Sequence, residues 1–266
     1  MLNFISTWLI AAQGLKAAMA EPIVGTFWHV AENFRMTFDF GKDSTSKFEM
    51  PGREPFFGKP FPLVGGPFTY TLDDEAVFEG ELFHGVTLWY HGIRVLLPEA
   101  DISPGDLRTL THNSFTVISA TFQGRELHFN RLTADLTLGV FQYKDPRDGR
   151  SEMTFNFYPN GHATAQFWCQ GERGAQATFR LQPGYTGNVY YTRYDMSPEI
   201  ILSSFLQLLV HLCGVEESGL DLRYVIFAQE DVLYVPFEGR MVALINEGKP
   251  LPARESCCSE HDICLT

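Results

Sequence analysis

The chain has 266 residues, 45% of them hydrophobic, so it can bury one large or two small cores and is not a disordered protein. Its 23 Phe, 10 Tyr, 23 Gly and 15 Pro favour many short strands joined by turns over a helical bundle. The formal net charge of −12, with no run of Lys or Arg, disfavours binding to nucleic acid or to anionic lipid surfaces.

The first twenty residues are mostly apolar and end in Ala18-Met19-Ala20, which fits a signal-peptide cleavage site. No Lys or Arg precedes the apolar run, and Gln13 and Lys16 interrupt it. The alternative is an amphipathic N-terminal helix packed on a β-domain. A membrane span is not expected, because it needs about 20 continuous apolar residues.

Short segments with alternating apolar residues recur along the chain and predict strands. They cover residues 26–40, 68–72, 86–97, 114–122 and 127–143. Residues 36–40 and 153–157 share the pattern Met-Thr-Phe-polar-Phe. Any half-buried strand alternates in this way, so we interpret the match as chance and not as a duplication.

Residues 48–67 are rich in Pro and Gly and predict a long loop. After Phe48, its phenylalanines are Phe56, Phe57 and Phe61, and Phe68 follows directly after the segment. They either cap the β-domain or form an exposed surface for a partner protein.

One helix is predicted at 197–214. Ser197 supplies a cap, Pro198 the first helical position and Glu199 a first-turn acid, and the apolar residues that follow end at Gly214. The apolar content predicts that this helix is buried on most sides.

A tyrosine-containing turn lies between two predicted strands, in the sequence Gln182-Pro183-Gly184-Tyr185-Thr186-Gly187. Pro183 fixes its own φ, and Gly184 and Gly187 accept positive φ, so the backbone can fold closely around a group packed on Tyr185. A second short pattern, Ser218-Gly219-Leu220-Asp221-Leu222, precedes two further predicted strands.

In this order, the two patterns resemble motifs of the deoxyuridine triphosphatase (dUTPase) family, and in particular its long herpesvirus form. The resemblance covers roughly residues 155–250. It implies a mainly all-β protein, with dUTPase-like β-barrel or sandwich domains and one buried linking helix. The implied organisation is an apolar segment 1–20, a β-domain 21–196, a linking helix 197–214, and a shortened second β-half with a Cys-rich tail, 215–266. The implied nucleotide-pocket residues are Gln182, Gly184, Tyr185, Gly187 and Asp221.

The chain departs from the family where catalysis takes place. The family has an aspartate as general base before Pro-Gly-Tyr, and Gln182 stands there instead. An amide can orient a water but cannot take its proton. The later phosphate-binding motifs of the family are missing, and Asp221 alone makes a poor Mg²⁺ site and is expected to be a solvated turn residue. No catalytic residue, metal or other cofactor is therefore expected, and Mg²⁺ would be needed only by an active dUTPase.

Five cysteines are an odd number, which favours a reduced compartment. Cys257, Cys258, His261 and Cys264 cluster near the end, but they lack the Cys-x-x-Cys spacing typical of zinc sites. We interpret this region as a mobile tail with reactive thiols.

Three functions remain open. The first is a non-catalytic, dUTPase-related viral protein that binds host or viral proteins in the host cytoplasm or nucleus. The second is an active enzyme that converts dUTP to dUMP and pyrophosphate. The third is a secreted β-barrel that binds an apolar ligand.

Overall fold

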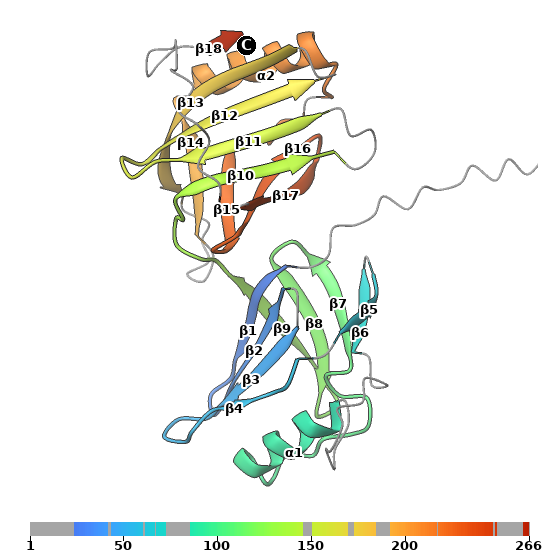
Figure 1. Cartoon of the computed structure of the whole chain (residues 1–266). Coiled ribbons are helices and arrows are strands. Elements are labelled where there is room, and N and C mark those ends of the chain that lie inside the picture. The colour runs from blue at the N-terminus through green and yellow to red at the C-terminus, as the bar shows by residue number, and fades with distance from the viewer. Residues whose placement is uncertain are drawn as a thin grey trace, which may run out of the picture.

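The structure is a computed structural model that describes residues 24–41, 44–60, 62–66, 68–72, 86–145, 151–169, 173–184, 192–216, 218–246, 248 and 263–265. The chain forms two β-sheets, each accompanied by one helix, which confirms the mainly all-β fold (Figure 1). The predicted N-terminal segment 1–20, the turn residues Tyr185 and Gly187, and Phe61 lie outside the described residues.

The first sheet has the strand order β4-β3-β2-β1-β9-β8-β7-β6-β5, and every pair in it is antiparallel. Its elements are β1 (Gly25–Val30), β2 (Arg35–Phe40), β3 (Thr45–Glu49), β4 (Phe56–Phe57), β5 (Leu63–Gly65), β6 (Thr69–Leu72), helix α1 (Val86–Leu96), β7 (Thr109–Ser114), β8 (Val117–Phe122) and β9 (Arg125–Leu132). The sheet curls around a core rich in phenylalanine, and α1 packs against it.

The second sheet has the order β12-β11-β10-β17-β16-β15-β14-β13, with β18 added beside β13. Its elements are β10 (Gly139–Lys144), β11 (Glu152–Phe157), β12 (His162–Cys169), β13 (Arg173–Gly184), β14 (Arg193–Ser197), helix α2 (Glu199–Cys213), β15 (Tyr224–Gln229), β16 (Val232–Phe237), β17 (Arg240–Asn246) and β18 (Ile263–Leu265). An additional pairing of β12 with β13 closes this sheet into an eight-stranded barrel.

The two sheets have the same topology. Strands β1, β2 and β3 correspond to β10, β11 and β12, and β7, β8 and β9 correspond to β15, β16 and β17, in the same spatial order. Each helix lies between corresponding strands, α1 between β6 and β7 and α2 between β14 and β15. We therefore call residues 24–132 the first repeat and residues 139–246 the second repeat.

Corresponding residues make corresponding contacts. The Met-Thr-Phe-polar-Phe segments lie on the equivalent strands β2 and β11, and their Phe pairs have ring centroids 5.9 Å apart in both, with interplanar angles of 21° and 15°. Gly25 and Gly139, opposite the last Phe of each segment, have φ of 122° and 134°. The interpretation of this match as chance is wrong, because the two segments occupy one position of a repeated fold.

The repeats differ in whether their sheet closes. In the second repeat, the unbroken β13 pairs with β12 along residues 173–180. In the first repeat its counterpart is split into β4 and β5, and Pro60 lies in the break. Proline has no N–H to donate to a ladder and disfavours a central strand. The first sheet therefore stays open between β4 and β5.

Three sequence predictions need correction here. Residues 86–97 were expected to form a strand and instead contain α1, whose buried Val86, Trp89, Tyr90 and Ile93 recur at the helical spacing of three and four. The two β-halves divide between β9 and β10, so the expected 21–196 domain spans both sheets. The second half begins at β10 and is complete, not a shortened segment 215–266.

Helix α2 was predicted correctly in place but not in detail. It does not join the repeats but packs inside the second one, where Ile201, Leu202, Phe205, Leu206 and Leu209 enter the core. Its opposite side is exposed, so it is not buried on most sides. The N-cap position is held by Pro198, while the Ser197 hydroxyl donates to the Arg180 carbonyl. Gly214 ends the helix in the left-handed conformation, as predicted.

A disulfide joins Cys169 at the end of β12 to Cys213 at the end of α2. The expectation of reduced thiols is wrong for this pair, because the odd cysteine count does not show that two of them meet on facing elements. Part of the predicted mobile tail is also ordered: β18 pairs with β13 between Ala175 and Ala177.

The repeats meet around Arg131, a buried cation that is 2% exposed. Its guanidinium lies 4.3 Å from the ring centroids of Phe27 and Phe115 and 5.3 Å from that of Tyr234 in the second repeat. Its Nε and Nη1 donate to the carbonyls of Phe115 and Val24 at 2.8 and 2.5 Å. Such a cation–aromatic stack stabilises the contact because the rings replace part of the lost hydration.

Candidate functional site

The two segments that resemble dUTPase motifs lie on either side of strand β14. Gln182 on β13 pairs in register with Asp195, and Gly184 pairs with Arg193. On the other edge of β14, Asp195 pairs with Tyr224, the first residue of β15. The fold thus places Gln182 and Gly184 in the same sheet as β15, the strand that follows the 218–222 turn, with β14 between them.

Asp221 is fully buried rather than solvated, which corrects the prediction. Its Oδ2 accepts the N–H of Ser218 at 2.7 Å, and its Oδ1 accepts the N–H of Gly239 at 3.2 Å. The carboxylate therefore fastens its own turn to the β16–β17 hairpin. Both oxygens of Asp221 accept hydrogen bonds from backbone groups inside the protein.

The first repeat contains the same arrangement. Asp106 is 2% exposed, and its Oδ2 accepts the N–H groups of Ser103 and Gln123 at 3.0 and 2.8 Å. The shared sequence is Ser-x-x-Asp-Leu-Arg, at residues 103–108 and 218–223. The leucines after both aspartates have positive φ, 57° at Leu107 and 52° at Leu222, a conformation that costs energy for a branched residue. The aspartate turn is a structural element of the repeat.

A pocket of about 250 Å³ lies where β14, the start of α2 and the start of β15 meet. It is lined by Arg193, Asp195, Met196, Glu199, Leu202, Leu220, Arg223 and Tyr224. Its volume is below the roughly 300–1,000 Å³ that small-molecule sites usually have. Two arginines and two carboxylates give the pocket a polar lining without an excess of either charge.

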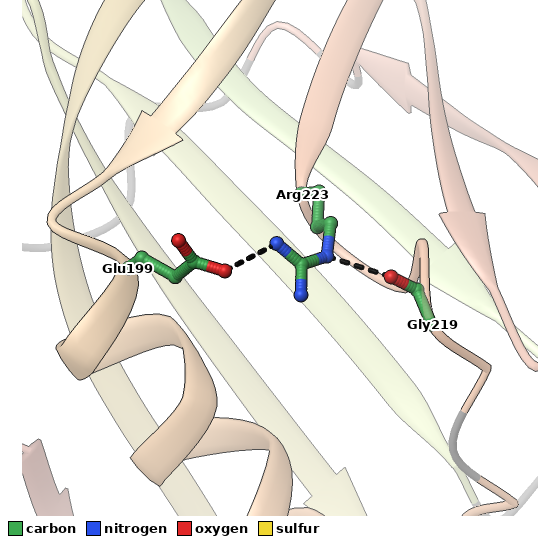
Figure 2. Close-up of polar contacts among 3 residues, drawn as sticks. All are labelled: Glu199, Gly219 and Arg223. Atoms are coloured by element: carbon green, nitrogen blue, oxygen red, sulfur yellow. Dashed lines mark hydrogen bonds and ion pairs between the residues drawn. The ribbon is translucent and has the colours of Figure 1, made fainter.

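The charges of this pocket pair with one another. Arg223 donates to Glu199 at 2.5 Å and to the Gly219 carbonyl at 2.6 Å, as Figure 2 shows. Glu199 is the first residue of α2, where a negative charge is favoured by the helix dipole. The Arg193 Nε lies 2.9 Å from the Asp195 carboxylate. An anionic ligand would have to displace these internal partners.

Tyr224 lies beside both charges of the second pair. Burial raises the pKa of Tyr224 above its ordinary value. The Arg193 guanidinium, which lies 5.0 Å from the centre of the ring, lowers this pKa in part, and the Asp195 carboxylate raises it. Its hydroxyl is therefore protonated at neutral pH and is a hydrogen-bond donor, not a base.

The phenylalanines of the predicted 48–67 loop divide between core and surface. Phe56 packs against α1, where a Cβ on Gly92 would overlap its ring. Phe57 is 66% exposed and lies below the Lys47 ammonium. Phe68, at the β5–β6 hairpin, is also exposed. Phe57 is thus an available contact residue, whereas Phe56 caps the core.

No group of three or more His, Cys, Asp or Glu side chains that could hold a metal ion occurs among the residues that the structure describes. Over the same part of the chain, neither helix has the length and apolar character that crossing a membrane requires. Sequence reasoning missed Arg193, Glu199 and Arg223, although the match of Arg223 with Arg108 in the repeated Ser-x-x-Asp-Leu-Arg was visible.

Comparisons with known proteins add little to this description. No family model and no curated protein matches the chain. A DNA polymerase III β sliding clamp (DnaN) from Bartonella birtlesii LL-WM9 aligns with 86% of this chain and 58% of its own, at 10% identity. The TM-score of 0.19 is too low for that likeness to support any inference about fold or function.

Proposed function

We propose that this chain is a non-catalytic relative of the dUTPases, of the herpesvirus type, that acts as a protein-interaction module. The observation that carries the proposal is the state of Asp221, which is fully buried with both carboxylate oxygens bonded to backbone N–H groups. The equivalent Asp106 also accepts two backbone N–H groups in the first repeat. The role of Asp221 in holding its turn explains this residue without a bound nucleotide.

The residues near Gln182 support the same proposal. Gln182 is exposed on β13, and its amide has no basicity with which to activate a water. The carboxylate opposite it, Asp195, is ion-paired with Arg193.

The test is to incubate the purified chain with dUTP and Mg²⁺ and to measure pyrophosphate release, with an active dUTPase as positive control. We expect no release from the chain. The Gln182→Asp variant should be equally inactive, because Asp221 stays bonded inside the protein. Sustained turnover of dUTP by the unmodified chain would contradict the proposal and support the active-enzyme alternative, for which Mg²⁺ would be required.

The third function, a barrel that binds an apolar ligand, has less support. One continuous cluster of buried side chains fills the second barrel, including Phe141, Phe157, Phe205 and Phe227. A small barrel packed in this way is a core and not a ligand cavity. We therefore keep protein binding, to host or viral proteins, as the proposed activity.

Location in the host cytoplasm or nucleus stays a prediction, and the Cys169–Cys213 disulfide favours the secreted alternative. Disulfides persist in oxidising compartments and are rare where thiols are kept reduced. Mass spectrometry of the native protein under non-reducing conditions would distinguish these locations, since a cross-linked peptide pair is expected only after passage through an oxidising environment.

A further inference from the structure

In the described part of the chain, the outer edge of strand β4 in the first repeat is open, whereas the equivalent edge in the second repeat is paired. In the second repeat, Ala175 and Gln176 of β13 pair with β12 on one edge and with β18 on the other. In the first repeat, β4 takes the place of this part of β13. Among the described residues, its second edge has no strand partner.

The correspondence is fixed by strand register. Met36 pairs with Phe48 and Phe48 with Phe56, whereas Met153 pairs with Phe167 and Phe167 with Ala175. Phe56 therefore occupies the position of Ala175, and Phe57 that of Gln176. Gln176 pairs with Cys264 in β18. The equivalent position beside Phe57, on the outer edge of β4, has no paired strand among the described residues.

We propose that the edge of β4 binds an extended segment of a partner protein, which adds as an antiparallel strand in the way that β18 adds to β13. This deepens the proposed function and rests on it. An edge strand offers unpaired backbone N–H and C=O groups, which are a template for another chain. Within the described part of the chain, the strand that could add in this way, β18, is already paired with β13, and the occupant that we propose for β4 is a segment of another protein.

Strand alternation gives the chemistry of that segment. Phe56 faces the core and α1, while Phe57 is 66% exposed. Residues of the partner in register with Phe56 and Gly58 will face the core side and should be apolar, whereas the residue opposite Phe57 faces solvent. The expected pattern is apolar-x-apolar, which the β18 sequence Ile-Cys-Leu also follows. Phe57 adds an aromatic contact across the new ladder.

The probe is a labelled synthetic peptide with the sequence of residues 260–266 in which the cysteine is replaced by serine. We expect saturable binding to the full chain by fluorescence anisotropy, together with slower hydrogen exchange within residues 56–58 at the backbone amide of Phe57, because the Gly58 amide already donates to the Ser46 carbonyl. A second peptide with proline at the central position lacks the N–H needed for the ladder and should bind about fivefold more weakly or worse.

Two variants of the protein complete the test. Phe57→Lys places a lysine on the edge strand, and lysines on natural edge strands prevent pairing with another chain. This variant should weaken binding of the probe by about fivefold. Phe68→Lys changes an equally exposed phenylalanine elsewhere and should not affect binding. Circular dichroism melting of both variants controls for loss of folding.

The proposal is overturned if the probe does not bind, if it slows exchange at 175–177 instead of 56–58, or if Phe57→Lys binds it as tightly as the unmodified chain. A dimer that competes with the probe and is lost in Phe57→Lys would also overturn it, because the occupant would then be a second copy. None of these results bears on dUTP turnover, so the failure of this inference is separable from failure of the proposed function.

Discussion

The second repeat is a closed barrel and the first is an open, curled sheet, although both follow one strand order. The difference lies in a single strand. β13 runs for 12 residues without interruption, whereas its counterpart consists of β4 and β5 with Pro60 between them. Topology therefore does not decide closure: the eighth strand must also run unbroken beside its neighbour, as β13 does along residues 173–180 where it pairs with β12.

The helices are also attached differently. α2 is covalently joined to β12 through Cys213 and Cys169. In the first repeat, α1 is held by polar contacts, in which Arg53 donates to the Leu96 carbonyl at 2.6 Å and Trp89 donates to the Lys59 carbonyl at 3.3 Å. The closed repeat therefore has a cross-link where the open repeat has hydrogen bonds and packing.

Breaking the disulfide should have the largest effect on this comparison. For a sequence separation of 44 residues, the loss of chain restriction is expected to cost the second repeat about 4 kcal/mol of unfolding free energy. The measurement is urea unfolding of the Cys169→Ser/Cys213→Ser double variant, followed by hydrogen exchange. Amides of the second repeat should lose protection and those of the first repeat should not. Equal loss in both would show that the repeats unfold as one unit.

The matched aspartate turns allow the next test. Asp221→Ala and Asp106→Ala each leave two backbone N–H groups without their carboxylate acceptor, at a cost of about 2–3 kcal/mol, because hydrogen bonds to a charged group contribute more than neutral ones. We expect similar losses of unfolding free energy in chemical denaturation, each confined to its own repeat. Asp→Asn should cost less, because the amide oxygen still accepts one of the two bonds made by Asp221 and can accept both of those made by Asp106. A stable Asp221→Ala protein would argue that Asp221 serves binding and not folding.

Tyr224 provides the smallest effect, through pH. Burial raises its pKa in the folded protein above the unfolded value of about 10. The folded chain therefore holds this proton longer than the unfolded chain, and stability is intact below pH 10 and falls as the pH rises through the raised pKa. Tyr224→Phe should make the alkaline loss of unfolding free energy less steep. An unchanged slope would exclude Tyr224 as the group responsible for the alkaline loss of stability.

Sequence reasoning located most strands because their apolar residues alternate and turn residues bound them, as in 26–40, which forms β1 and β2. It failed at 86–97, where Val86, Trp89 and Ile93 fit a helical period that a reading based on alternation overlooks. Sequence reasoning also placed Gln182 and Asp221 in one nucleotide pocket, because their segments resemble two motifs of the dUTPase family. The fold does bring their segments near each other, but it turns Asp221 inward, which a sequence motif cannot show.

The β-rich composition, the position and end of α2, and the repeated Met-Thr-Phe and Ser-x-x-Asp-Leu-Arg segments can all be read from the sequence, because they depend on residues close together in the chain. The three-dimensional fold was needed to show that those segments belong to two copies of one topology, that Cys169 meets Cys213, and that one sheet closes while the other does not. These features depend on which strand edges meet across long sequence separations, and that is set by backbone pairing and shared burial rather than by local pattern.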